Sequence, residues 1–124
     1  MKSTEWGQED FLMLHRADLS QLKPLLQARQ LLPRDITVLV MLMSHVNWRS
    51  GRARVTATFL AEEIGMQRTH VTSSIGRLRK EMLVARVREP ASGDVYFLLN
   101  PYLVSVGGPE RRNLLWAQFQ ASLE

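Results

Sequence analysis

Apolar residues recur at helical spacing in the middle of the chain, in two segments separated by one glycine. The first segment has a threonine, Thr56 or Thr58, where a side-chain oxygen caps the first turn of a helix. Gly65 ends the segment, because a left-handed backbone conformation is cheap for glycine. The inward face of this predicted helix holds three residues, Leu60, Ala61 and Ile64.

The second segment predicts a helix over about residues 67–81. Its apolar stripe consists of Val71, Ile75, Leu78 and Met82. Polar residues occupy the opposite face, namely Arg68, Thr69, Thr72, Ser73 and Arg77. Two helices hinged at a glycine are typical of a helix-turn-helix, and Arg, Ser and Thr suit the helix that enters the major groove of DNA. The alternative is that this face is an ordinary solvated surface.

Alternating apolar and polar residues follow at once and predict a β-hairpin. Residues 84–88 and 95–99 form its strands, and residues 90–94 form its tip. This is the wing of a winged helix. Arg86 and Arg88 fall on one face of the first strand, where they either meet DNA or act as edge-strand charges that discourage sheet pairing.

Upstream, Pro33 and Asp35 open a strong helix that continues to about Trp48. Its expected apolar stripe comprises Ile36, Leu39, Val40, Met43, Val46 and Asn47. Residues 52–55 predict a short strand that pairs with the wing. Residues 10–15 predict a short strand or extended arm, and a helix around residues 19–31 should be interrupted or restarted by Pro24.

Residues 109–123 predict a last helix that a small winged core has little interior left to cover. An apolar patch on such a helix favours a second subunit, and a two-fold dimer is the commonest closed solution. In the alternative, this helix packs on the chain's own scaffold helix near Trp48. The candidate dimer residues are Leu114, Leu115, Trp116, Phe119 and Leu123.

These elements predict a mainly α protein with a small β-hairpin wing, an α+β winged helix-turn-helix with an N-terminal arm and helix and an extra C-terminal helix. The 124 residues suit one domain, with residues 1–32 as arm and helix, 33–100 as winged core and 109–123 as terminal helix. Zero cysteine excludes disulfides and thiolate zinc sites. No apolar run spans a bilayer and no signal peptide is evident, so we expect no membrane contact and a cytoplasmic location.

Charge is concentrated on the proposed reading elements. The net charge of +4 divides into zero over residues 1–48, +5 over residues 49–90 and −1 over residues 91–124. A basic footprint confined to the helix-turn-helix and wing is what phosphate neutralisation requires, so double-stranded DNA is the expected partner. The candidate reading residues are Gln67, Arg68, Thr69, His70, Thr72, Ser73 and Arg77. The candidate backbone and wing contacts are Arg49, Arg52, Arg54, Lys80, Arg86 and Arg88.

Enzymatic chemistry is not expected. His15, His45 and His70 are too dispersed for a metal-ligand spacing, and no cofactor motif is present. Gly107-Gly108-Pro109 lacks the lysine and hydroxyl of a phosphate loop, and its proline removes a backbone donor. We therefore expect no catalytic residues, no metal and no cofactor.

The order of these elements resembles the Firmicute-type plasmid replication proteins, a winged-helix group, and the helix-turn-helix part is similar to many winged-helix transcription regulators. One departure is Met82, where winged helices commonly place glycine. The residues that carry the resemblance are Asn47, residues 60–65, Val71, Ile75, Leu78, Leu83, Tyr96, Leu99-Asn100-Pro101 and Gly107.

The resemblance implies DNA binding at an operator or an origin. Three hypotheses follow: a sequence-specific transcription regulator, a replication initiator of a plasmid or phage, and a winged helix used for protein contact. The first is ranked first because regulation is the commonest use of a small lone winged helix. A transcription regulator or a replication initiator would also contact the transcription or the replication machinery.

Overall fold

The computed structural model describes residues 12–14, 20–47, 50–101, 104–106 and 109–123. Its helices are α2 (Leu22–Gln27), α3 (Pro33–Ser44), α4 (Ala57–Ile64), α5 (Arg68–Lys80) and α6 (Pro109–Ser122). Its strands are β1 (Leu12–Leu14), β2 (Arg52–Ala53), β3 (Val84–Arg88), β4 (Val95–Leu99) and β5 (Val104–Val106). The chain is mainly α with a small antiparallel sheet, in the order and architecture of a winged helix-turn-helix, and the predicted fold class is confirmed.

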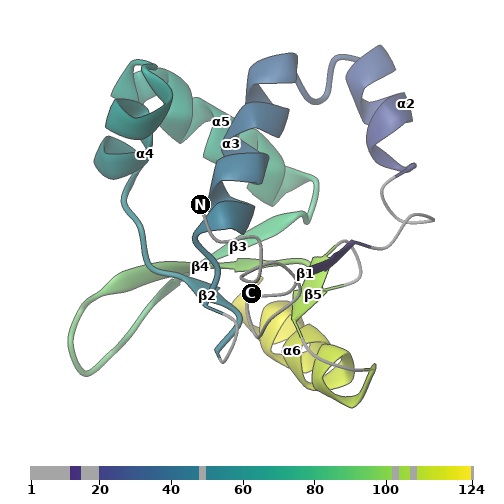
Figure 1. The fold of residues 1–124 in the computed structure, drawn as a ribbon, viewed down its shortest axis with the longest axis vertical. Helices are drawn as coiled ribbons and strands as arrows, with labels where there is room; N and C mark the ends of the chain where they lie inside the picture. Colours follow the sequence, from purple (N-terminus) through teal and green to yellow (C-terminus); the bar gives the residue numbers. More distant parts are fainter. Residues whose placement is uncertain (1–11, 15–19, 48–49, 102–103, 107–108, 124) are drawn as a thin grey trace, which may run out of the picture.

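A three-stranded antiparallel sheet in the order β2-β4-β3 separates two layers of helices. Helices α3, α4 and α5 lie on one side of it, and α6 lies on the other (Figure 1). We call the sheet face toward α5 the inner face and the face toward α6 the outer face. The register pairs Arg86 with Phe97 and Ala85 with Leu98, so successive residues alternate between the two faces.

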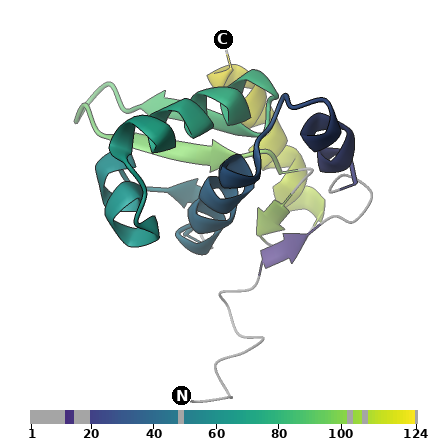
Figure 2. The ribbon, with the colours of Figure 1, turned by 90° about the horizontal axis from the view of Figure 1, so that it is seen from above.

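Each face has its own core. On the inner face, Val84, Phe97 and Leu99 pack with buried residues of the three helices, such as Leu39, Leu60, Val71 and Leu78. On the outer face, Ala85, Tyr96 and Leu98 pack with Phe119 of α6. The hairpin tip between β3 and β4 projects beyond the helices (Figure 2).

The helix-turn-helix follows the predicted capping. Thr56 is the N-cap of α4, and its Oγ1 accepts a hydrogen bond from the backbone N–H of Phe59 at 3.0 Å. Gly65 ends α4 with φ 79°, in the left-handed region. Gln67 is the N-cap of α5, and Val71, Ile75 and Leu78 are buried as expected.

The prediction that Met82 belongs to the buried stripe of α5 is wrong. The fourth member of the predicted core stripe is 55% exposed, because the chain leaves α5 before reaching it. Its φ of 60° is left-handed. Met82 therefore occupies the turn conformation in which glycine is favoured, and it does so without glycine's freedom.

Helix α3 begins at Pro33 as predicted, but it ends at Ser44 and its buried stripe lies about one residue away from the expected one. Val38 and Leu42 are buried with Leu39, whereas Val40 is half-exposed. The helix carries two adjoining apolar stripes, and the inward one includes Asp35. Trp48, the expected end of the helix, lies outside the described residues.

The described N-terminal residues form the predicted short strand and a helix that is shorter than predicted. Strand β1 pairs antiparallel with β5, which confirms a short strand within residues 10–15. Helix α2 is only six residues long, much shorter than the predicted 19–31 segment. Pro24 lies in its first turn, where the missing N–H would have no helical partner.

Helix α6 corrects the expectation that the terminal helix has little interior to fill. Phe119 is fully buried against the outer face, and Trp116 stacks on it with ring centroids 5.9 Å apart. Leu115 packs over Gly51, where an added Cβ would lie 2.9 Å from a Leu115 methyl carbon. Leu114 and Leu123 remain exposed, but nine residues along a helix separate them by about half a turn. Of the five residues proposed for a dimer, Phe119 and Trp116 thus belong to the chain's own outer-face core, whereas Leu114 and Leu123 stay exposed.

Candidate nucleic-acid interface

The exposed face of α5 holds most of the predicted reading residues. Arg68, Thr69, Thr72 and Ser73 are exposed, as are Gln67 and His70 at the start of the helix. Lys80 is exposed at its end. No carboxylate stands in the first turn of α5, so this end of the helix presents positive charge and unsatisfied N–H groups outward.

A hollow of about 620 Å³ lies between α5, the start of α4 and the inner face of the wing. Three arginines line it: Arg68 and Arg79 from α5, and Arg86 from β3. No aspartate or glutamate contributes to the lining. The remaining lining residues are Val55, Thr56, Ala57, Thr58, Thr72, Ile75, Gly76, Val95 and Phe97.

The wing arginines share the inner face, as their spacing predicted. Arg86 and Arg88 pair across the ladder with Phe97 and Val95, so both side chains leave the sheet on the side of α5. Both are exposed. Arg88 Nη1 also donates a hydrogen bond to the carbonyl of Gly93 at 3.1 Å, which ties this side chain to the hairpin tip.

Arg77 does not lie on the exposed face, which corrects its predicted placement. Its Nε donates to Asp35 Oδ2 at 2.7 Å and its Nη2 donates to Asp35 Oδ1 at 2.8 Å. The Asp35 side chain is fully buried and that of Arg77 is 28% exposed. This bidentate pair joins α3 to α5, and it uses the guanidinium edge that a base or phosphate would need.

Asp35 is held as a carboxylate. Burial alone would raise its pKa, but hydrogen bonds outweigh that effect and lower the pKa below its ordinary value. The largest comes from Arg77, and the backbone N–H of Leu32 adds another at 2.7 Å. The same pair raises the pKa of Arg77. Asp35 thus caps the start of α3 and anchors α5 with one side chain.

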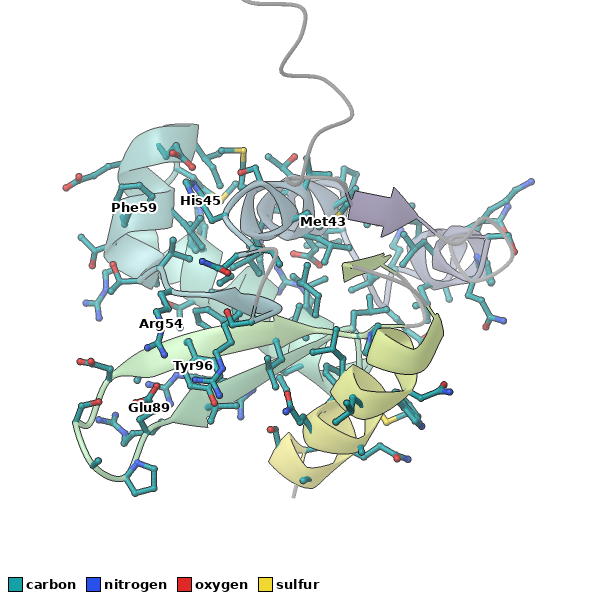
Figure 3. All side chains as sticks on the ribbon, turned by 60° about the horizontal axis from the view of Figure 1, so that its bottom comes forward. Met43, His45, Arg54, Phe59, Glu89 and Tyr96 are labelled. Atoms are coloured by element: carbon teal, nitrogen blue, oxygen red, sulfur yellow. The ribbon has the colours of Figure 1, made fainter. Side chains whose placement is uncertain are left out.

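Arg52 and Arg54 lie on the outer face, away from α5, which corrects the expectation that they join the same contact surface. Both donate to Glu89 Oε1, at 3.3 Å and 2.6 Å. Both guanidinium carbons lie over the ring of Tyr96, 4.5 Å and 5.1 Å from its centroid. Figure 3 shows Arg54, Glu89 and Tyr96 gathered beside the sheet at the base of the wing.

The Glu89 hydrogen bond raises the pKa of Arg54, and the same bond lowers the pKa of Glu89. The outer-face cations therefore have a counter-charge within the chain. Arg49, the remaining predicted backbone contact, lies outside the described residues.

Arg79 lines the hollow, and the sequence analysis did not single it out. It lies eleven residues after Arg68, which brings it back to nearly the same side of a helix. Arg77 lies nine residues after Arg68, about half a turn away. Helical spacing alone could have found Arg79. Thr56 and Thr58 also line the hollow, whereas their sequence pattern predicts only a capping role.

A second polar contact holds α3 against α4. His45, the C-cap residue of α3, places Nε2 2.7 Å from Glu63 Oε1, and its ring meets that of Phe59 edge-on at 5.3 Å (Figure 3). Within the described parts of the chain, no group of three or more His, Asp or Glu side chains could hold a metal ion. Within the same residues, every helix is too short or too polar to cross a membrane.

Comparison with known proteins gives a distant likeness in structure and none in sequence. No protein-family model matches the sequence, and no curated protein matches it. Among solved structures, the chain is similar to the YusO protein from Bacillus subtilis, with 19% sequence identity and a TM-score of 0.43. The likeness covers 87% of this chain and 69% of that one.

Proposed function

We propose that this protein binds double-stranded DNA sequence-specifically and acts as a transcription regulator. The observation that carries the proposal is the hollow shared by α5 and the wing, into which two separate elements bring Arg68, Arg79 and Arg86 without any lining carboxylate. A surface of this kind attracts a polyanion, because its positive charge is not compensated within the lining.

The geometry of α5 favours duplex DNA over other polyanions. An α-helix with its side chains is about 10–12 Å across and fits the major groove, which is about 12 Å wide. Arg68 at the first turn can donate two hydrogen bonds to guanine, and the exposed hydroxyls of Thr69, Thr72 and Ser73 can serve base edges or phosphates. Arg86 and Arg88 would then meet the backbone or the adjacent minor groove from the wing.

A role in transcription regulation is favoured over a role in replication initiation. The Leu99-Asn100-Pro101 element, which favoured the replication proteins by resemblance, has a folding role. Asn100 Nδ2 donates to the carbonyl of Met82 at 2.9 Å, its backbone N–H donates to Leu83 O at 2.9 Å, and Pro101 is buried. These contacts close the corner between α5 and the sheet, so they add nothing to an initiator role. The proposed activity is binding, with no catalytic step.

Selection of bound duplexes from a random library, followed by affinity measurements, tests the proposal. Arg68→Ala should weaken binding to the selected site by about 1–3 kcal/mol and binding to random duplex much less, because base readout is lost. Lys23→Ala, which removes an exposed charge on α2 away from the hollow, should leave both affinities unchanged.

Two results would overturn the proposal. If the wild-type chain binds no duplex at low salt, the surface has another partner, and a protein-contact role replaces DNA binding. If Lys23→Ala weakens binding as much as Arg68→Ala, the interaction follows total charge and not this surface.

A further inference from the structure

Gly76 has no explanation in the fold. Four glycines are described, and Gly51, Gly65 and Gly93 each have a positive φ, which favours glycine. Gly76 lies within helix α5, and a Cβ added there would meet nothing within 4 Å. Glycine inside a helix costs about 1 kcal/mol relative to alanine. No described contact of the chain offsets this cost.

Gly76 opens onto the hollow between α5 and the wing, so its missing side chain leaves room there. The floor is apolar, with Val55 and Val95 beside the largely buried Ile75 and Phe97. The lining also includes the three arginines and three threonines, Thr56, Thr58 and Thr72. Apolar and cationic groups are thus combined in one concavity.

The start of α4 adds a further positive contribution. Thr56 and residues 57 and 58, the N-cap and first helical positions, line the hollow. Backbone N–H groups at a helix start are only partly satisfied and favour negative charge. Among the described residues, no ion pair engages Arg68, Arg79 or Arg86.

We infer that this hollow is a binding site for a small amphipathic organic anion, with one acidic group and a flat apolar body of about two fused rings. The acidic group would meet the arginines, and the body would lie along Ile75 and Phe97 in the space left by Gly76. A volume of about 620 Å³ is that of a small-molecule site and far exceeds one phosphate group. A phosphate alone also has no use for an apolar floor.

Occupation of the hollow would oppose DNA binding, because the anion and the duplex would use the same three arginines. This competition rests on the proposed function, whereas binding of the anion does not. The two parts can therefore be measured separately, first without DNA and then with it.

Titration of the full chain with naphthoate, followed by amide chemical shifts and calorimetry, tests the site. Naphthoate should bind at one site, with shifts centred on residues 55–58, 76, 79, 86 and 97. Naphthylmethanol, which lacks the charge, and inorganic phosphate, which lacks the apolar body, should each bind about tenfold or more weakly. Equal binding by the alcohol, or by phosphate, overturns the inference.

The Cβ of Gly76→Leu would meet no atom within 4 Å, and leucine improves helix propensity, so this variant should keep the fold while weakening naphthoate binding about tenfold or more. Ala117→Leu adds similar bulk at an exposed position of α6 and serves as the matched control, with naphthoate affinity unchanged. Arg79→Gln is the second variant, expected to weaken naphthoate about tenfold by removing one cation. A folded Gly76→Leu or Arg79→Gln chain with wild-type naphthoate affinity overturns the location.

Naphthoate should also raise the apparent Kd of the wild-type chain for its selected duplex, and naphthylmethanol should not. If naphthoate binds but the duplex affinity is unchanged, the competition is wrong and the site stands alone. If the chain binds naphthoate but no duplex under any condition, the proposed function fails while the anion site is retained.

Discussion

Two arginines lie on each face of the β2-β4-β3 sheet. Those on the outer face pair with a carboxylate, and those on the inner face do not. On the outer face, Arg52 and Arg54 share Glu89 and lie over Tyr96. On the inner face, Arg86 and Arg88 have no carboxylate partner among the described residues, and Arg86 joins two arginines of α5. The difference lies in the partner of each cation and not in the number of cations.

This difference changes the meaning of the charge distribution along the sequence. Residues 49–90 carry a net charge of +5, which by itself suggests one broad basic footprint. In the structure, Arg77 pairs with Asp35, and Arg52 and Arg54 share the one carboxylate of Glu89. Among residues 50–90, the arginines without an ion pair are Arg68, Arg79, Arg86 and Arg88, and they lie on α5 and the inner face. Under the proposed function, DNA would bind at this one face of the sheet.

The largest expected effect is a loss of stability when the core between the outer face and α6 is disrupted. Phe119→Ala should lower the free energy of unfolding by about 3–5 kcal/mol, because a fully buried ring would leave a cavity against Tyr96 and Leu98. Leu114→Ala on the same helix is the control and should change it by about 0.5 kcal/mol or less, because Leu114 is 64% exposed. Urea unfolding measures both.

A Phe119→Ala chain that is as stable as wild type but changes from dimer to monomer in light scattering would contradict this assignment. The outer face would then contribute an interface between subunits, as the sequence analysis first predicted, and the comparison between the two faces would have to be made on a dimer.

The next effect concerns the pair that anchors α5 beside the inner face. Asp35→Asn should lower the free energy of unfolding at neutral pH by about 3 kcal/mol, the lower end for breaking a buried pair, because Arg77 keeps some contact with water. Thermal or urea unfolding at several pH values measures it. Glu62→Gln removes an exposed carboxylate of α4 and should have almost no effect.

The pH dependence has a definite sign. The folded-state pKa of Asp35 lies below the ordinary value of 3.8, so folding favours the ionised carboxylate. Its contribution to stability is complete well above that value and is lost as the pH falls through the folded-state pKa. The difference between wild type and Asp35→Asn should therefore shrink in acid. A difference that grew on acidification would show that Asp35 is not the anchoring carboxylate.

The helix-turn-helix and wing could be predicted from sequence because local chemistry specifies them. Thr56 caps α4, Gly65 supplies the left-handed turn, and the alternation of residues 84–88 and 95–99 fixes which side chains share a face. Each of these signals acts over a few residues. The predicted strand bounds of the wing accordingly agree with β3 and β4.

The misplaced parts depend on contacts between distant residues. Helix α3 has two adjoining apolar stripes, and only the pairing of Asp35 with Arg77, 42 positions away, shows which one faces inward. The helix that covers the outer face, α6, likewise comes after the whole wing in the sequence. Neither contact leaves a local pattern, whereas Arg79 could have been predicted by following the helical spacing to the end of α5.

The smallest expected effect compares the two faces directly, through the salt dependence of duplex binding. Each phosphate contact that is lost should reduce the slope of log affinity against log salt by about 0.9. Arg86→Ala on the inner face should show this reduction on selected and random duplexes alike, because a backbone contact carries no sequence information. Arg54→Ala removes the same charge from the outer face and should leave the slope unchanged, because Glu89 already compensates that cation. The two variants match in residue type and net charge change, and both arginines are exposed. Equal reductions would mean that DNA responds to net charge and that the two faces do not differ in function; a reduction for Arg54→Ala alone would place the interface on the outer face.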